Sequence, residues 1–288
     1  MRSPARPAMP DARVSAPGGA VVAQDQPGDG GAPGGAHAIE LTGVSKVFET
    51  KDGRVEALEG VSLTVRPQEF VCLIGPSGCG KSTILNLLVD LVRPSAGRVA
   101  VSGKDPGQAC RDREMGLVFQ DPVLLPWRSV RENIEVPLGV LRVPKVKRQE
   151  TVRGLVHLVG LEGFEDRFPH ELSGGMRQRV GIARALSFDP PILLMDEPFG
   201  ALDAITRDKM SLELLTIWDR RQKTVVFVTH SISEAALLSD RVIVLSPRPG
   251  RISAVIENPL SRPRTLAMRD EPDFLSVSRQ LRDLLERE

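Results

Sequence analysis

A glycine-rich loop between a strand and a helix constrains this chain more than any other feature. Residues 75–83 read GPSGCGKST and fit the pattern G-x-x-x-x-G-K-[ST]. The apolar run FVCLI at 70–74 predicts a buried strand before the loop, and residues 83–89 predict a helix after it. This order of elements predicts a phosphate-binding loop rather than a glycine-rich turn that binds nothing.

The residue types in the loop suit a nucleotide polyphosphate. Its glycines allow backbone N–H groups to converge on phosphate oxygens, and the following helix N-terminus adds unpaired donors. Lys81 is expected to reach the β- and γ-phosphates, and the Ser82 hydroxyl is expected to ligate Mg²⁺. The predicted nucleotide contacts of the loop are Gly75, Pro76, Ser77, Gly78, Cys79, Gly80, Lys81, Ser82 and Thr83.

The three cysteines, Cys72, Cys79 and Cys110, show neither metal-ligand nor disulfide spacing, which fits a reducing cytoplasm. Cys79 lies between two glycines and close to Lys81, and a positive local field there favours the reactive thiolate. We therefore expect thiol reagents to inactivate the protein and a bound nucleotide to protect it. The alternative, an inert thiol that points into the core, stays open.

Composition excludes several classes of protein. The net charge is +1, from 38 basic and 37 acidic residues, whereas a nucleic-acid-binding protein normally has a basic excess. No run approaches 18 consecutive apolar residues, so no transmembrane helix is predicted. Residues 1–38 are rich in Pro, Gly and Ala and lack the apolar core of a secretory signal, which predicts a disordered tail.

Apolar runs recur through the second half of the chain, separated by helical patterns. Residues 191–195 and 224–228 predict buried strands on either side of an amphipathic helix at 203–221. Apolar strands that alternate with helices predict an α/β fold with a mostly parallel sheet covered on both faces. Further strands are expected at 39–48, 55–65, 97–101, 116–119, 241–245 and 252–256, and a helical C-terminal segment at 274–285.

A helical segment interrupts this pattern. Between residues 129 and 160 the apolar residues recur at helical spacing, which predicts a helical insert between strands. The insert has a basic face, which we interpret as a solvated helix surface rather than a nucleic-acid site. That face contains Arg142, Lys145, Lys147, Arg148 and Arg153.

Two acidic residues end the strand LLMDE at 193–197. The carboxyl edge of a parallel sheet, beside a phosphate loop, is where ligands bind in such folds. Asp196 is therefore predicted to hold Mg²⁺, directly or through water, and Glu197 to polarise an attacking water. An acidic strand-to-loop turn without a function is the alternative.

A second helix start follows the insert, in the segment LSGGMRQR at 172–179. Ser173 suits an N-cap, and Gly174 and Gly175 leave backbone donors open to an anion. From the residues alone, an anion-binding helix start and a simply capped helix both remain open.

Taken in order, these motifs resemble the ATP-binding cassette (ABC) family, from residue 39 to about residue 256. The resemblance rests on the phosphate loop, on Ser-Gly-Gly followed by Arg-Gln-Arg, on Asp-Glu-Pro and on a histidine after the next strand. The signature motif matches residues 172–176, with Met176 where many members carry Gln. The resemblance implies further nucleotide-contacting and catalytic residues, namely Phe48 stacked on adenine, Gln120 at Mg²⁺ and the membrane subunit, Ser173, Gly174 and Gly175 of the signature, Asp203 of the aspartate loop and the switch residue His230.

The resemblance also implies an architecture. It is a P-loop NTPase with a mostly parallel sheet, an N-terminal antiparallel β part and an inserted helical subdomain. The expected division is a tail at 1–38, an ATPase domain at 39–262 with the helical subdomain at about 122–171, and a C-terminal helical extension at 263–288. Two copies would dimerise head to tail, the signature of one closing over ATP held by the other. The implied catalytic residues are Lys81, Gln120, Glu197 and His230, and the implied metal ligands are Ser82, Gln120 and Asp196.

Finer similarity points to one group within the family. The segments FQDPVLLPW at 119–127 and DEPFGALD at 196–203 resemble the importer ATPases for nitrate, sulfonates and taurine, and so does the C-terminal pattern of Pro263-Arg264, Arg269-Asp270 and Phe274. Such a subunit would energise uptake of a small anion or sulfonate-like solute, with ATP and Mg²⁺, at the cytoplasmic face of the inner membrane. A soluble ABC ATPase of DNA repair or translation and an exporter ATPase remain open as alternatives.

The implied partners are membrane permease subunits, a second ATPase subunit and, indirectly, a periplasmic or lipid-anchored solute-binding protein. No nucleic-acid partner is expected. An apolar cluster in a loop-like setting is interpreted as the permease docking groove, although the same residues would also suit the core. The cluster consists of Val123, Leu124, Leu125 and Trp127.

Overall fold

The computed structural model describes residues 37–51 and 53–287. The predicted disordered tail at 1–38 lies outside these residues, apart from His37 and Ala38. Ala38 is buried, and its N–H donates to the carbonyl of Val65 (2.8 Å), so backbone pairing is already present there. Within the described part of the chain, no helix is both long and apolar enough to cross a membrane.

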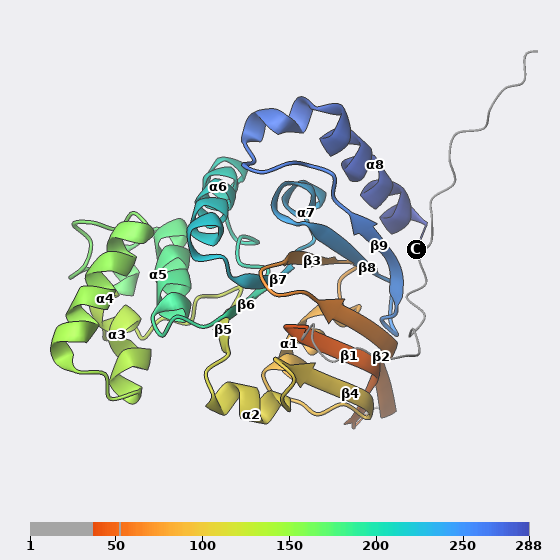
Figure 1. Ribbon diagram of the computed structural model, residues 1–288, viewed down its shortest axis with the longest axis horizontal. Helices are drawn as coiled ribbons and strands as arrows, with labels where there is room; N and C mark the ends of the chain where they lie inside the picture. Colours follow the sequence, from red (N-terminus) through yellow and green to blue (C-terminus); the bar gives the residue numbers. More distant parts are fainter. Residues whose placement is uncertain (1–36, 52, 288) are drawn as a thin grey trace, which may run out of the picture. The chain divides into compact units, whose positions relative to one another are not determined.

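A six-stranded sheet forms the centre of the fold (Figure 1). Its five parallel strands are apolar and almost entirely buried, which explains the continuous apolar runs of the sequence, whereas the antiparallel edge strand is only partly buried. All neighbours pair in parallel except the last two, which are antiparallel. Across the sheet the order is β5 (Met115–Val118), β6 (Ile192–Asp196), β7 (Thr224–Val228), β3 (Phe70–Ile74), β8 (Arg241–Leu245) and β9 (Ile252–Glu257).

A second, antiparallel sheet is built from the first part of the chain. Its order is β2 (Gly53–Val65), β1 (Ile39–Thr50) and β4 (Ala96–Val101), with Ile39 paired to both Val65 and Val101. The expected α/β fold, with a mostly parallel sheet and an N-terminal antiparallel part, is confirmed.

The helices fall into two groups. Between β5 and β6 the chain forms α3 (Val130–Val140), α4 (Lys145–Leu158) and α5 (Gly174–Leu186), which gather on one side of the molecule (Figure 1). A capping box of Ser129 and Glu132 starts α3, and this local signal explains why the predicted helical segment begins there. The remaining helices are α1 (Lys81–Leu88), α2 (Pro106–Arg111), α6 (Ala204–Arg221), α7 (Ile232–Leu238), α8 (Pro272–Glu286) and the 3₁₀ turns η1 (Pro169–Glu171) and η2 (Leu266–Asp270).

The central sheet separates two apolar cores, as the side chains of β3 show. Phe70, Cys72 and Ile74 point into a core shared with the buried faces of α5, α6 and α7. Val71 and Leu73 point to the other face, into a core shared with α1 and the antiparallel sheet. Successive strand residues alternate between faces, so both faces of the sheet are covered.

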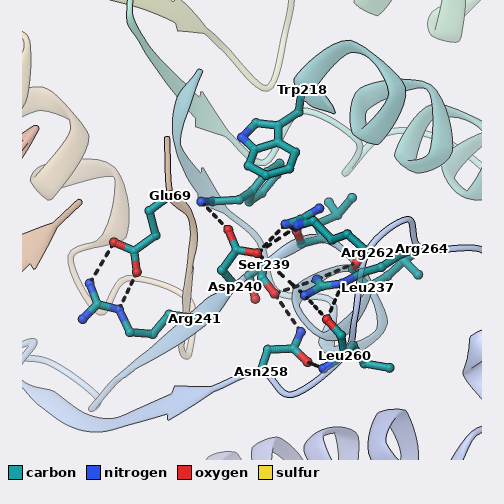
Figure 2. Close-up of polar contacts among 12 residues, drawn as sticks. Glu69, Trp218, Leu237, Ser239, Asp240, Arg241, Asn258, Leu260, Arg262 and Arg264 are labelled. Atoms are coloured by element: carbon teal, nitrogen blue, oxygen red, sulfur yellow. Dashed lines mark hydrogen bonds and ion pairs between the residues drawn. The ribbon is translucent and has the colours of Figure 1, made fainter. Parts of the chain in front are cut away.

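A segment after β9 closes the carboxyl end of α7 (Figure 2). Arg264 is fully buried and donates to the carbonyls of Leu237 (3.0 Å), Ser239 (2.7 Å) and Leu260 (2.9 Å). Burial lowers the pKa of the Arg264 guanidinium to about 10. Asn258 donates to the carbonyls of Ser239 and Ala236 (both 2.7 Å), so the last carbonyls of the helix find partners in this segment.

Neighbouring contacts also hold this segment after β9 against the fold. The guanidinium of Arg262 binds Asp240 (2.7 Å) and lies 3.9 Å from the centre of the Trp218 ring. From there the chain continues into α8, where Phe274 and Leu281 are buried against the core. The predicted C-terminal helix is therefore present and packed.

Replacing Arg264 by Gln should lower the free energy of unfolding by about 3 kcal/mol, because several buried carbonyls lose their donor. Urea denaturation with an unchanged m-value measures this loss. Arg279→Gln is the matched control, since Arg279 is exposed on α8 and makes no hydrogen bond or ion pair with the described residues. Equal stability of the two variants would show that Arg264 does not anchor α7.

Candidate functional site

The phosphate loop lies between β3 and α1 and depends on glycine for its shape. Gly78 and Gly80 have φ angles of 77° and 101°, in the left-handed region that other residues rarely adopt. A Cβ on Gly80 would lie 2.5 Å from a methyl carbon of Leu58 and 2.8 Å from the carbonyl of Ala57. The loop therefore needs glycine both for its backbone conformation and for the close approach of β2.

Lys81 is the first residue of α1 and its side chain turns back over the loop. The ammonium donates to the carbonyls of Gly75 (2.8 Å) and Pro76 (2.9 Å), and the residue is buried. The cation is thus held at the mouth of a loop whose N–H groups and helix N-terminus favour an anion. The expected contact of Lys81 with phosphate stays a prediction.

A turn after β8 forms the outer wall of the loop, and the sequence reasoning missed it. A Cβ on Gly250 would lie only 1.9 Å from the carbonyl oxygen of Cys79, and the Gly250 N–H donates to Ala57 (3.0 Å). Arg248 in the same turn donates from Nε to the carbonyl of Gly78 (3.3 Å). The segment SPRPGR at 246–251 signals a turn, but nothing local indicates that it packs on residues 170 positions earlier.

The structure corrects the expectation for Cys79. The side chain is almost fully buried, and burial raises the pKa of its thiol, although the neighbouring Lys81 acts in the opposite direction. Desolvation outweighs the positive field because the thiolate would lose water that one ammonium does not replace. Cys79 is therefore a packed, protonated thiol, which is the alternative that the sequence left open.

Asp196 ends β6 next to the loop. The Ser82 hydroxyl donates to its Oδ1 (3.1 Å), and burial raises the pKa of the Asp196 carboxyl. A hydroxyl and a half-buried carboxylate side by side are the hard oxygen ligands that Mg²⁺ prefers, so the residues fit that ion. No group of three or more His, Cys, Asp or Glu in the described residues is arranged around one metal position, so phosphate oxygens or water would have to complete the ligand set.

Glu197 and His230 meet although they are 33 residues apart. The Nδ1 of His230 lies 3.0 Å from the Oε2 of Glu197. Glu197 has a φ of 42°, which is strained for a residue with a side chain, and its N–H donates to the carbonyl of Val228 (3.0 Å). Both side chains remain partly exposed, so a water molecule has access to a carboxylate that an imidazole orients.

Gln120 lies on the same side of the site, after β5. A Cβ built on Gly200 would be 3.3 Å from its Nε2 and 3.6 Å from the Oε2 of Glu197, so both side chains border Gly200. Phe48 is placed separately, near the end of β1, where it pairs with Val55 and its ring faces the Lys46 ammonium at 4.8 Å.

Two helix N-termini lie together away from the phosphate loop. Ser173 caps α5 by accepting from the N–H of Met176 (3.3 Å), and Asp203 caps α6 by accepting from the N–H of Thr206 (3.0 Å). Hydrogen bonding to Thr206 lowers the pKa of the Asp203 carboxyl. A Cβ on Gly175 would be 3.0 Å from a methyl of Thr206, so the two helix starts touch.

The predicted site residues thus form two groups rather than one. Lys81, Ser82, Asp196, Glu197 and His230 converge at the edge of the central sheet. Among the described residues, Ser173, Gly174, Gly175 and Asp203 make no hydrogen bond with the phosphate loop.

Helix α5 also holds the segment around Gln120, through Gln178 of the Arg-Gln-Arg motif and through Arg184, which the sequence reasoning did not single out. The buried Gln178 donates to the carbonyl of Phe119 (3.2 Å). Arg184 donates to the carbonyls of Pro122 (2.6 Å) and Val123 (3.0 Å), and burial lowers its pKa. Their spacing along one helix is visible in the sequence, but their partners lie about sixty residues earlier.

The apolar cluster after Gln120 is divided between surface and core. Val123 is 59% exposed and Trp127 is 70% exposed. Leu124 and Leu125 are half-buried, and Leu124 packs against the main core, so the core interpretation applies to that residue. The buried Asn133 binds the N–H (2.8 Å) and carbonyl (3.2 Å) of Leu125, which fixes the loop that presents Trp127.

Comparisons with known proteins identify the family of this chain. The sequence pattern of the ABC transporter family matches residues 58–200. The chain is 46% identical over 250 residues to an uncharacterised ABC transporter ATP-binding protein of Methanocaldococcus jannaschii, covering 87% of this chain and 92% of that protein. It is 49% identical over 217 residues to the taurine import ATP-binding protein TauB of Rhizobium johnstonii, covering 75% and 82%.

Two further proteins are similar to this chain. Identity to the aliphatic sulfonates import ATP-binding protein SsuB of Bacillus thuringiensis is 45% over 226 residues, covering 78% of this chain and 88% of that protein. A dimeric ATP-binding cassette solved in a post-hydrolysis state with ADP and Pi superposes with a TM-score of 0.68 at 33% identity, covering 76% and 98%.

Replacing Gly250 by Ala should weaken nucleotide binding, because the new methyl group overlaps the Cys79 carbonyl and must displace the phosphate loop. Overpacking of this kind costs about 1–3 kcal/mol, or roughly 5- to 150-fold in Kd. Titration with a fluorescent ATP analogue measures the change. Gly154→Ala on α4 is the control, since nothing lies within 4 Å of its Cβ position. A normal Kd for Gly250→Ala would show that the turn does not support the loop.

Proposed function

The chain belongs to the ATP-binding cassette family of transporter ATPases, and on that premise we propose that it is the ATP-hydrolysing subunit of an importer for a small anion or sulfonate-like solute. The approach of Glu197 to His230, beside the Ser82–Asp196 pair, is the observation that carries the hydrolytic part. The proposals of import and of a sulfonate-like solute rest on relatives that are named as taurine and aliphatic sulfonate import proteins. These names do not favour an exporter or a DNA-repair or translation ATPase.

In the proposed mechanism the residues of this chain hold and polarise the reactants. The N–H groups of residues 75–83 and the Lys81 ammonium bind the β- and γ-phosphates. Glu197 accepts a proton from the attacking water, and His230 orients that carboxylate and the γ-phosphate. Phe48 is the proposed platform for the adenine ring.

Ser82, Asp196 and Gln120 are the proposed holders of Mg²⁺. A bound Mg²⁺ would supply positive charge that offsets the negative charge developing on the phosphate oxygens. The partial burial of Asp196 suits this role, because a carboxylate that has lost part of its surrounding water gains more from a nearby cation.

A second copy of the chain is proposed to complete the site. Ser173, Gly174, Gly175 and Asp203 have the capped helix starts of an anion site but are not joined to their own phosphate loop. In a head-to-tail dimer they would face the ATP bound by the partner. The dimeric cassette with ADP and Pi among the similar structures supports this arrangement.

Helix α5 supplies a mechanical connection between nucleotide and permease. Its first residues belong to the proposed partner-facing signature, whereas Arg184 near its end binds Pro122 and Val123 in the exposed apolar loop. Movement of the signature on ATP binding therefore moves this loop. Trp127 and Val123 are the proposed contacts of the membrane permease.

The proposed cellular setting follows from these partners. The subunit would lie peripherally at the cytoplasmic face of the inner membrane, bound to permease subunits that receive solute from a periplasmic or lipid-anchored binding protein. The proposed division of the chain is an ATPase domain at 39–262, a helical subdomain at about 122–171 and a C-terminal extension at 263–288. The tail at 1–38 has no proposed role.

Replacing Glu197 by Gln should preserve ATP binding and reduce turnover by about 10²–10⁴-fold, because the amide keeps the shape but does not accept a proton. The trapped ATP should hold two copies together, which size-exclusion chromatography with Mg-ATP detects. Lys81→Ala, which should bind ATP weakly and remain monomeric, is the control. Full turnover by Glu197→Gln would exclude the assigned base, and a monomer with bound ATP would exclude the sandwich dimer.

Replacing Val123 and Trp127 by Ser should abolish co-purification with the permease while basal ATPase activity stays within about twofold, because both side chains are exposed. Val140→Ser is the matched control, since Val140 is 76% exposed at the other end of α3. Retained permease binding by the double variant, or equal loss in the control, would contradict the docking surface.

A further inference from the structure

A buried carboxylate lies directly behind the proposed switch histidine. Glu234 sits in the first turn of α7, and its side chain is 7% exposed. Its Oε2 accepts from the hydroxyl of Thr229 (2.5 Å), and its Oε1 lies 3.4 Å from the Nε of Arg207 on α6. Burial raises the pKa of this carboxyl, while Thr229 and Arg207 favour its charged form.

The contacts of Glu234 fix the backbone on both sides of His230. Thr229, which precedes the histidine, also accepts from the N–H of Ser231, which follows it (3.0 Å). The Ser231 hydroxyl in turn accepts from the N–H of Glu234 (3.3 Å). His230 is therefore the exposed member of a short segment in which the Glu234 carboxylate holds Thr229, and Ser231 is held by Thr229 and by the backbone N–H of Glu234.

Arg207 connects this segment to a second part of the site. Its guanidinium donates to the carbonyl of Leu202 (3.0 Å), the residue before Asp203. One side chain thus contacts both the aspartate loop and the carboxylate that supports His230. In the described residues, the salt bridge between Arg207 and Glu234 is the only one that joins α6 to α7 directly.

Anchoring α7 in the fold does not require this ion pair. The carboxyl end of the helix is held by Arg264 and Asn258, and its Ala235–Leu238 face is buried in the core (Figure 2). A buried ion pair is also a poor source of stability compared with apolar residues of the same size. The placement of Arg207 and Glu234 therefore points to a role in fixing geometry.

We propose that Arg207 and Glu234 are positioning residues for hydrolysis, which align His230 with Glu197 and couple that alignment to the aspartate loop. The proposal rests on the role proposed above for His230. It predicts that loss of either residue impairs the chemical step without impairing ATP binding, because neither side chain contacts the phosphate loop.

The test uses the full chain and the variants Glu234→Gln, Arg207→Met and Arg207→Lys. Glu234→Gln and Arg207→Met should lower kcat by about 10- to 100-fold, the effect expected from a small misplacement of a catalytic group. The KM for ATP and the Kd of a fluorescent ATP analogue should stay within about twofold. Arg207→Lys should recover part of the lost kcat, because it retains the charge beside Glu234.

Combined variants distinguish a positioning role from a general loss of structure, because the losses of kcat should not add if both residues act through His230. In a His230→Ala background, Glu234→Gln should change kcat by less than about twofold, because the residue it positions is already absent. The double variant of Arg207 and Glu234 should be no slower than the slower single variant. Additive losses in either combination would overturn the proposal.

A neighbouring ion pair provides a matched control. Asp208, next to Arg207 on α6, pairs with Arg269 of η2 at 2.5 Å, and both side chains are half-buried. Asp208→Asn should lower the melting temperature about as much as Glu234→Gln and leave kcat unchanged. Equal loss of kcat in this control would show that the effect is structural. Absence of ATPase activity in the wild type would reject the proposed function itself, whereas normal kcat in Glu234→Gln would reject only the positioning role.

Discussion

The pairing register of three parallel strands determines where the chemical groups of this protein lie. Val228 of β7 pairs with Leu73 of β3 on one side and with Asp196 of β6 on the other. The pairing continues one residue further, because the N–H groups of Thr229 and Glu197 donate to Leu73 (3.2 Å) and Val228 (3.0 Å). The phosphate loop, the acidic pair and the histidine segment therefore leave the sheet at one edge, and a one-residue shift would separate them.

Two helices connect this site to more distant parts of the protein. Helix α5 has 13 residues and spans about 20 Å, from the cap at Ser173 to Arg184 at the apolar loop. Helix α6 starts at the cap of Asp203 and carries Arg207, which reaches Glu234 on α7. The first connection ends in hydrogen bonds from Arg184 to two carbonyls, which have a preferred direction that apolar contacts lack. The second ends in an ion pair between Arg207 and Glu234 at 3.4 Å.

The contacts that the sequence predicted join residues close together in the chain, whereas the contacts that it missed join residues far apart in the chain. The cap at Ser173 was expected, because a cap depends on residues within one turn. The packing of Arg248 on the phosphate loop was not, because its partner is 170 residues away. Cys79 shows the same limit: its neighbours suggest a stabilised thiolate, but burial by distant residues raises its pKa. Features set by neighbouring residues, such as a helix cap, were predictable from the sequence. The contacts that support the site residues from behind depend on tertiary packing and were not.

The exposed tryptophan is best understood through the rigidity of the loop that carries it. Asn133 binds both backbone groups of Leu125, and Arg184 binds the carbonyls on the other side of the loop. A loop held in this way loses little conformational entropy when a partner docks. Burial of an indole ring removes a large apolar area from water. A rigid loop that presents an exposed Trp127 therefore has the properties of a preformed docking site, and its attachment to α5 is the proposed route by which a docked partner would respond to the nucleotide.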